Sequence, residues 1–133
     1  GGNPCRARGI VSISGVVNQS REPIVRVSVW GPQQRKLAVE AVVDTGFNDY
    51  LTLPIQAIDS LELELKEVVE AQLADGSFVN LPIYVGWVEW LGDERRVAIC
   101  AAEGDPLLGM ALLHGSKLTI EAVPGGQVII ENL

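Results

Sequence analysis

The tripeptide Asp44-Thr45-Gly46 combines the residue types that a carboxylate-based active site needs. It follows an apolar run ending in Val42 and Val43, so a strand is expected to deliver the acid into a tight turn. An unpaired carboxylate in apolar surroundings is costly, and such a group is expected to have a function or a partner. The Thr45 hydroxyl can hydrogen-bond locally, and Gly46 permits backbone angles and close approaches that a side chain would block.

Two further features lie downstream of this tripeptide. Asp75-Gly76 stands between two long candidate strands, and this dipeptide readily takes the positive φ angles of a two-residue turn, which predicts a long β-hairpin with an exposed tip. The segment Asp105-Pro106-Leu107-Leu108-Gly109 then leads an apolar pair into a glycine. On shape alone, an ordinary surface hairpin explains the first of these features, and the tripeptide occurs by chance in many strand-turn segments.

Short β-branched runs separated by Gly and Pro make up most of the chain, and this pattern predicts a mainly β fold. A short helix is expected to start at Pro54 as its first helical residue, and another is expected over Met110 to His114, ending at Gly115. The candidate strands are Ile10–Val17, Ile24–Trp30, Leu37–Val43, Tyr50–Leu53, Leu61–Ala74, Phe78–Trp90, Arg95–Ala102, Lys117–Ala122 and Gln127–Glu131.

The order of these features resembles the retropepsin-like aspartic proteases. In that family an apolar-apolar-Asp-Thr-Gly loop is followed by a β-hairpin flap, then by an apolar-apolar-glycine element before a helix and a last strand. The likeness covers Ile10 to Leu133, and Asp-Thr-Gly-Phe followed by Tyr-Leu-Thr-Leu-Pro is more similar to the small prokaryotic members than to the retroviral ones. The resemblance implies a closed β-barrel of the acid-protease type with one short helix and a hairpin flap, assembled as a homodimer.

The resemblance also implies an aspartic endopeptidase that hydrolyses peptide bonds of extended or unfolded polypeptides. Two aspartates share one proton, and while one activates a water the other protonates the substrate carbonyl. This mechanism needs two carboxylates, whereas the chain holds a single Asp-Thr-Gly, so a twofold axis is expected to pair Asp44 with Asp44 of a second copy. The mechanism needs no metal and no organic cofactor.

The implied roles extend beyond Asp44. Thr45 would hydrogen-bond across the dimer axis, and Gly46 would present its backbone close to the substrate. Substrate contacts are expected from the flap tip and from the catalytic loop, and the apolar-apolar-glycine element is expected to support that loop. The flap tip consists of Asp75, Gly76 and Ser77, and the loop residues are Phe47, Asn48 and Asp49. The supporting element consists of Leu107, Leu108 and Gly109.

The chain departs from the retroviral pattern in two places. Phe47 is bulky where those members have a small residue, so specificity cannot be transferred. Met110 and Ala111 follow Gly109 where those members place an arginine that pairs with an acid of the loop. The strands that join two copies vary within the fold, and the segment Gln127 to Leu133 is the expected interface.

Composition sets limits on the function. The 133 residues are 47% hydrophobic, enough for one buried core, so residues 10–133 are expected to form a single domain behind a flexible leader or cloning remnant at residues 1–9. A net charge of −7 without a basic patch argues against nucleic acid as a partner. The apolar runs are too short for a membrane helix, so no membrane partner is expected.

The cysteines and the histidine add little chemistry. Two cysteines, Cys5 and Cys100, do not make a disulfide framework, which favours a cytoplasmic location, and Cys100 is expected to be a buried structural thiol. His114 is the only histidine, so neither a catalytic triad nor a metal site is expected, and a structural role near a helix end is favoured.

Two alternatives to the endopeptidase stay open. A retropepsin-fold module could bind or dimerise without catalysis, because a fold does not guarantee a function. The chain could also be a self-processing protease domain of a larger precursor.

Overall fold

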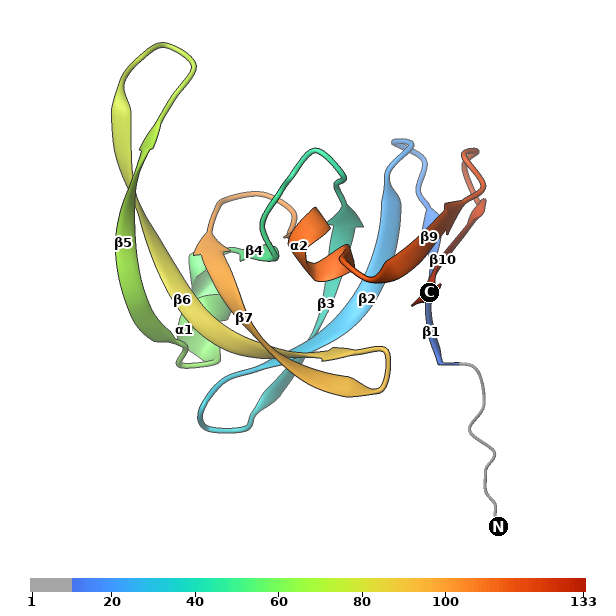
Figure 1. The fold of residues 1–133 in the computed structure, drawn as a ribbon, viewed down its shortest axis with the longest axis horizontal. Coiled ribbons are helices and arrows are strands. Elements are labelled where there is room, and N and C mark those ends of the chain that lie inside the picture. Colours follow the sequence, from blue (N-terminus) through green and yellow to red (C-terminus); the bar gives the residue numbers. More distant parts are fainter. Residues whose placement is uncertain (1–10) are drawn as a thin grey trace.

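Gly, Pro, Asn and Asp separate the strands, as the sequence predicts. The computed structural model describes residues 11–133, which form a ten-stranded sheet and two short helices (Figure 1). The leader, Cys5 and the expected first strand residue Ile10 lie outside the described residues. The elements are β1 (Ser12–Val17), β2 (Pro23–Trp30), β3 (Lys36–Val43), β4 (Leu51–Leu53), α1 (Ile55–Ser60), β5 (Glu64–Gln72), β6 (Phe78–Trp90), β7 (Asp93–Ala101), β8 (Leu107–Leu108), α2 (Met110–Leu113), β9 (Ser116–Ile120) and β10 (Gln127–Asn132).

Part of the sheet closes into a barrel. The strand order is β5-β6-β7-β4-β8-β3-β2-β1-β10-β9, and β2 also pairs with β6 through Val29↔Val88 and Trp30↔Trp87. The ring therefore runs β6-β7-β4-β8-β3-β2 and back to β6. Figure 1 shows what the ring leaves outside: the β5–β6 hairpin projects on one side, and β1, β9 and β10 lie on the other.

The core fills the barrel and follows the strand alternation. Trp90, Leu51, Leu53, Ile99 and Leu108 are among the largest fully buried side chains. Burying one such apolar side chain stabilises the fold by roughly 1.5–3 kcal/mol. The strand β3 alternates between exposed and buried residues at its start but is buried continuously over its last three, as expected where a strand is covered on both faces. That buried end is the part of the strand that leads into the loop starting at Asp44.

Several predicted boundaries are wrong by a few residues. The strand expected from Leu61 starts only at Glu64, because Leu61 is the C-cap of α1 and Glu62 has a positive φ of 53°. Leu61 and Leu63 are both buried, so this reversal of the chain brings two leucines to the core. Pro54 stands just before α1 as its N-cap rather than as its first helical residue. The structure has two short helices, whereas the family resemblance implied one.

The hairpin turn also differs from the expected two-residue type. Only Gly76 has a positive φ, of 89°, and the Gly76 N–H donates to the Leu73 carbonyl at 2.9 Å. The Leu73 N–H donates to the Ser77 carbonyl at 2.7 Å, so the loop begins one residue earlier than predicted and contains residues 74–76. Asp75 stays at negative φ, and this is the geometry of a three-residue loop with a left-handed glycine.

The predicted role of Cys100 is only partly correct. The thiol is half-buried on β7 rather than fully buried. Trp90 is completely buried and Trp30 nearly so, in line with a structural use of these rings. Across residues 11–133, the helices are all too short to cross a membrane.

Candidate active site

Asp44 directly follows β3, where backbone contacts with β8 fix the end of the strand. The last residues of β3 pair in parallel with β8, Val42 with Leu107 and Val43 with Leu108. The Asp44 N–H then donates to the Leu108 carbonyl at 2.9 Å. The predicted acid therefore starts its loop beside a two-residue strand that comes from far along the chain and ends in the buried Leu108.

The loop turns tightly around the Asp44 carboxylate. The Gly46 N–H donates to Asp44 Oδ1 at 2.9 Å, and the Phe47 N–H donates to the Asp44 carbonyl at 3.1 Å. A Cβ at Gly46 would lie 3.3 Å from Asp44 Oδ1, which is a tight contact. Gly46 does not have a positive φ, so the glycine serves close approach rather than an unusual backbone angle. One carboxylate oxygen is thus oriented by its own turn.

Thr45 and Gly46 are exposed, and Asp44 itself is partly exposed. Asn48 and Asp49 are exposed as well, whereas Phe47 is half-buried. In a single copy the partly exposed Asp44 therefore lies near the surface, at the start of its loop, and not at the bottom of a deep cavity.

The other half of the loop is bound to the start of α2. The Met110 N–H donates to the Phe47 carbonyl at 2.8 Å, and the Ala111 N–H donates to the Asp49 carbonyl at 3.2 Å. The Gly109 N–H donates to the Tyr50 carbonyl at 3.0 Å. Because these bonds use backbone groups on both sides, the position of the loop depends on the course of the chain from Leu108 to Ala111.

Gly109 is the point of closest contact between the two segments. A Cβ there would lie 2.3 Å from the Asp49 carbonyl oxygen and 2.6 Å from both the carbonyl oxygen and Cδ2 of Phe47. No side chain fits in this space, so glycine is required by the neighbouring backbone. The bulky Phe47 ring, which departs from the retroviral pattern, packs against this glycine.

A buried threonine completes the support and was missed in the sequence. Thr52, in β4, is 6% exposed, and its Oγ1 accepts a hydrogen bond from the Leu107 N–H at 2.9 Å. The β4 strand also pairs with β8 through Leu51↔Leu108 and in parallel with β7. A polar residue between Leu51 and Leu53 was the available signal, because a buried hydroxyl needs a partner.

The tip of the β5–β6 hairpin is held only by bonds within itself. Asp75 Oδ1 accepts hydrogen bonds from the Ser77 hydroxyl at 2.6 Å and the Ser77 N–H at 2.9 Å. These bonds lower the pKa of Asp75 below its usual value, the hydroxyl contributing most. In Figure 1 the tip lies well away from the loop after β3. The predicted tip residues are thus not in contact with the predicted loop residues in this single copy.

One face of the hairpin is apolar along its length. Three cross-strand pairs place half-buried apolar side chains on this face, apart from Glu67 at its base. The pairs are Ala71↔Val79, Val69↔Leu81 and Glu67↔Ile83. Ile83 is in turn the β-sheet partner of Cys100. Burial and, to a smaller extent, the Asp49 charge raise the pKa of the Cys100 thiol.

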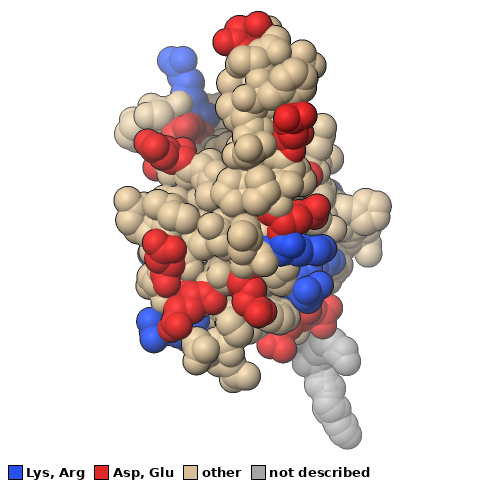
Figure 2. All heavy atoms as spheres, turned by 90° about the vertical axis from the view of Figure 1, so that its left-hand side faces the viewer, with Lys and Arg blue, Asp and Glu red and all other residues tan. Residues whose placement is uncertain are grey.

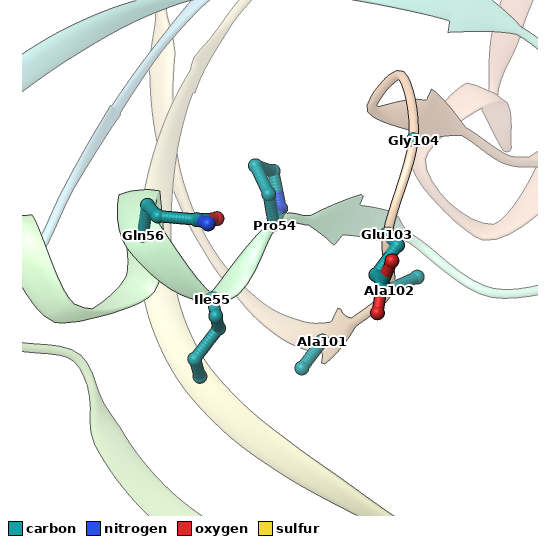
Figure 3. A pocket seen from close by; sticks show the side chains of 7 residues that line it. All are labelled: Pro54, Ile55, Gln56, Ala101, Ala102, Glu103 and Gly104. Atoms are coloured by element: carbon teal, nitrogen blue, oxygen red, sulfur yellow. The ribbon is translucent and has the colours of Figure 1, made fainter.

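The surface around the hairpin carries charges of both signs. Figure 2 shows acidic side chains scattered over this side of the molecule and fewer basic ones between them, without a broad basic patch on this face. A separate hollow of about 490 Å³ lies between the start of α1 and the segment 101–104 (Figure 3), and none of the predicted site residues lines it. Within residues 11–133, no three His, Cys, Asp or Glu side chains cluster as metal ligands would.

The fold has a counterpart among solved structures. The chain is similar to a retropepsin-like aspartic protease from Rickettsia conorii, with a TM-score of 0.59, 16% sequence identity and a match that covers 98% of each chain. No protein-family model and no curated protein matches the sequence. The chain therefore has a retropepsin-like, mainly β fold, as the order of its motifs predicted.

Proposed function

We propose that this chain is an aspartic endopeptidase whose catalytic dyad consists of Asp44 from each of two copies. The observation that carries the proposal is the Asp44 turn. A partly exposed carboxylate, oriented by the Gly46 N–H, stands on a loop that four backbone hydrogen bonds tie to residues 108–111, on a retropepsin-like fold. A general acid or base must be held in position to be effective. The backbone hydrogen bonds of this loop provide such a fixed position.

A single copy supplies only half of the proposed chemistry. The sequence has one Asp-Thr-Gly, while water activation and carbonyl protonation need two carboxyl groups that share a proton. The surface position of Asp44 suits a twofold arrangement, because a second copy can approach the loop without displacing the core. Thr45 and Gly46, both exposed, are the residues that would meet across the axis.

The proposed substrate is an extended polypeptide. Residues 78–82 of β6 pair with β5 on one side, whereas the pairing with β7 begins only at Ile83. This leaves one edge of the strand free over the outer part of the hairpin. A peptide in extended conformation can bind such an edge through main-chain hydrogen bonds. In this proposal the hairpin acts as a flap, and Phe47, Asn48 and Asp49 contact side chains of the substrate beside the loop.

The test compares cleavage by the wild-type chain and by Asp44→Asn. A diverse peptide pool is incubated with each protein from acidic to neutral pH, and products are identified by mass spectrometry. The substitution keeps the shape of the side chain but removes its acid–base function, so cleavage is expected to fall by at least about a hundredfold. Asp59→Asn is the matched control, because Asp59 is an exposed acid on α1, and this variant is expected to cleave like the wild type.

The pH profile provides an independent check. A pair of carboxyl groups is competent only while it holds one proton, so cleavage is expected under mildly acidic conditions and is expected to be lost as both groups ionise. A rate that rises steadily into alkaline pH would rule out the dyad. If neither wild type nor Asp44→Asn cleaves although dimers are present in solution, the non-catalytic binding module becomes the better interpretation.

A further inference from the structure

A small hollow that carries two basic side chains lies where the β5–β6 hairpin joins the barrel. Its volume is about 170 Å³, and it is lined by Tyr50, Lys66, Val85, Arg96, Val97 and Ala98. A cavity of roughly 10–15 Å³ already holds one water molecule, so this hollow has room for a group of several atoms. None of the predicted site residues lines it, and it shares no residue with the hollow beside α1.

Lys66 reaches the hollow from a β-bulge at the base of the hairpin. In the pairing of β5 with β6, Leu65 lies opposite Tyr84 and Glu67 lies opposite Ile83, so Lys66 is the extra residue without a partner. A bulge bends its strand and changes the direction of a side chain, and bulges are frequent beside functional sites. The bulge therefore gives Lys66 a position that the regular alternation of the strand does not fix.

Arg96 and Tyr50 reach the same hollow from two other elements. Arg96 belongs to β7, and the side chain of Ala98, two residues further along the strand, is on the same face. Tyr50 ends the loop that starts at Asp44, and its carbonyl accepts a hydrogen bond from the Gly109 N–H at 3.0 Å. The hollow therefore collects side chains from the hairpin, from the barrel and from the end of the Asp44 loop.

The two basic side chains have no acidic partner within residues 11–133. Both are exposed. The sequence has 17 acidic and 10 basic residues, so acids are plentiful, yet the ion pairs in this part of the chain involve other bases, namely Arg26–Glu40, Arg35–Glu62 and Lys36–Glu89. Glu64 and Glu67 flank Lys66 in β5, but neither forms an ion pair with it. Two like charges at one hollow repel each other, and an anion between them replaces this repulsion by attraction.

We propose that this hollow binds an oxyanion, a carboxylate or a phosphate-type group, through Lys66, Arg96 and the Tyr50 hydroxyl. A guanidinium presents paired N–H donors that match two oxygens of such a group, and an ammonium adds a compact positive charge. The Tyr50 ring packs against the core, and its O–H is a further donor. A neutral or cationic ligand would leave the two positive charges unbalanced.

The inference goes beyond the proposed function, because it uses neither Asp44 nor a second copy of the chain. A bound oxyanion joins the base of the hairpin at Lys66 to β7 at Arg96 and to the end of the Asp44 loop at Tyr50. A ligand that binds only the folded chain also stabilises it by mass action. The midpoint of thermal unfolding is therefore expected to rise with the concentration of the anion.

NMR titration tests the site with two probes. Sodium phosphate is added to the ¹⁵N-labelled chain at constant ionic strength, with chloride as the balancing anion, so that general screening stays fixed. The backbone amide signals of Tyr50, Lys66 and Arg96 are expected to shift and saturate, whereas that of Gly76 at the hairpin tip is expected to stay in place. The α-amide of N-acetylglutamate is titrated in the same way. The probe with the lower dissociation constant identifies the source of the oxyanion, a free phosphate-type ion or an acidic side chain of a polypeptide.

Variants test which groups hold the anion. Lys66→Gln and Arg96→Gln are each expected to raise the dissociation constant about tenfold, and the double variant is expected to lose saturable binding. Tyr50→Phe keeps the ring but removes the donor, so a rise of roughly threefold is expected. Arg26→Gln/Lys117→Gln is the matched control, because it removes the same net charge at exposed positions outside the hollow. Its dissociation constant is expected to equal that of the wild type.

The outcomes separate this inference from the proposed function. The absence of saturable shifts with both probes overturns the oxyanion site. The site is also overturned if the double variant binds as tightly as the wild type, or if the control variant loses binding as strongly as the double variant does. Peptide cleavage by the wild type would then leave the protease proposal standing. Asp44→Asn is expected to bind both probes like the wild type, so a failure of cleavage leaves the oxyanion site intact.

Discussion

The loop that holds Asp44 and the tip of the β5–β6 hairpin are both turns that follow strands, yet they are held in different ways. Asp44, Phe47, Asp49 and Tyr50 bond through their backbones to a segment from the other end of the domain. The hairpin tip bonds only to itself, through Leu73, Asp75, Gly76 and Ser77. The first turn is fixed by tertiary structure, and the second by local chemistry alone.

This difference suits two tasks that the proposed protease would have to combine. An acid–base group has to stay within a fraction of an ångström of its productive position, whereas a cover over an extended substrate has to open. Few tertiary contacts and many exposed backbone bonds are features of segments that open locally at low free-energy cost. We therefore expect the hairpin to move about its base while the Asp44 loop stays in place.

The largest effect is expected at the contact that fixes the loop. Gly109→Ala places a methyl group 2.3 Å from the Asp49 carbonyl oxygen and 2.6 Å from the Phe47 carbonyl oxygen, so backbone has to shift. The free energy of unfolding should fall by about 3 kcal/mol, measured by chemical denaturation, and peptide cleavage should be lost.

Gly76→Ala at the hairpin tip is the matched comparison. No atom lies within 4 Å of the added Cβ, and the cost comes only from the positive φ of 89°. A loss of about 1 kcal/mol is expected, with the rest of the fold unchanged. If the two substitutions destabilised the protein equally, the contrast between a tertiary and a local turn would be wrong.

A smaller effect is expected at Thr52, in the strand β4 that supports β8. Thr52→Val removes the acceptor for the Leu107 N–H without changing the size of the side chain. A buried N–H that loses its partner costs about 1–3 kcal/mol, so thermal unfolding should show a clear decrease in stability. Thr52→Ser keeps the hydroxyl and should retain the hydrogen bond. Equal stability of Thr52→Val and wild type would show that the bond to β8 is dispensable.

The smallest effect is expected at the tip and depends on pH. The pKa of Asp75 is lowered in the folded state by its bonds to Ser77, so the turn gains from an ionised Asp75 above the ordinary value of 3.8 and loses this gain as pH falls through the lowered pKa. Ser77→Ala should raise the pKa of Asp75 toward 3.8, measured by NMR titration of its carboxyl carbon. An unchanged titration curve in Ser77→Ala would mean that the hydroxyl does not stabilise the carboxylate.

Local chemistry was readable from the sequence because it depends on neighbours in the chain. Apolar alternation and Gly or Pro punctuation placed most strands within a few residues, and Gly76 marked the hairpin tip. The turn type was mispredicted because Asp75-Gly76 fits a two-residue loop and a three-residue loop equally well. The two loops differ only in which residue of the first strand pairs with Ser77. The start of β5 was mispredicted because Leu61 and Leu63 alternate as a strand would but bury both side chains around a reversal.

Tertiary relations were not readable in the same way. The two-residue strand β8 is too short to show a period, and its parallel pairing with β3 depends on segments far apart in the chain. The bond from Leu107 to Thr52 and the space that only Gly109 fits arise from the same distant pairing. The family resemblance indicated that these segments belong together, but their contacts come from the structure.

Because β8 lies far from β3 in the chain, the two strands are synthesised at different times and can pair only after the later one has been made. Residues 44–50 leave the ribosome long before Leu108 to Ala111, to which they bond. Parallel pairing between distant segments is slow, because a long loop must close before the contact stabilises anything. A nascent or truncated chain that ends before residue 108 therefore carries Asp44 without its support, so synthesis itself delays the point at which the carboxylate can be positioned.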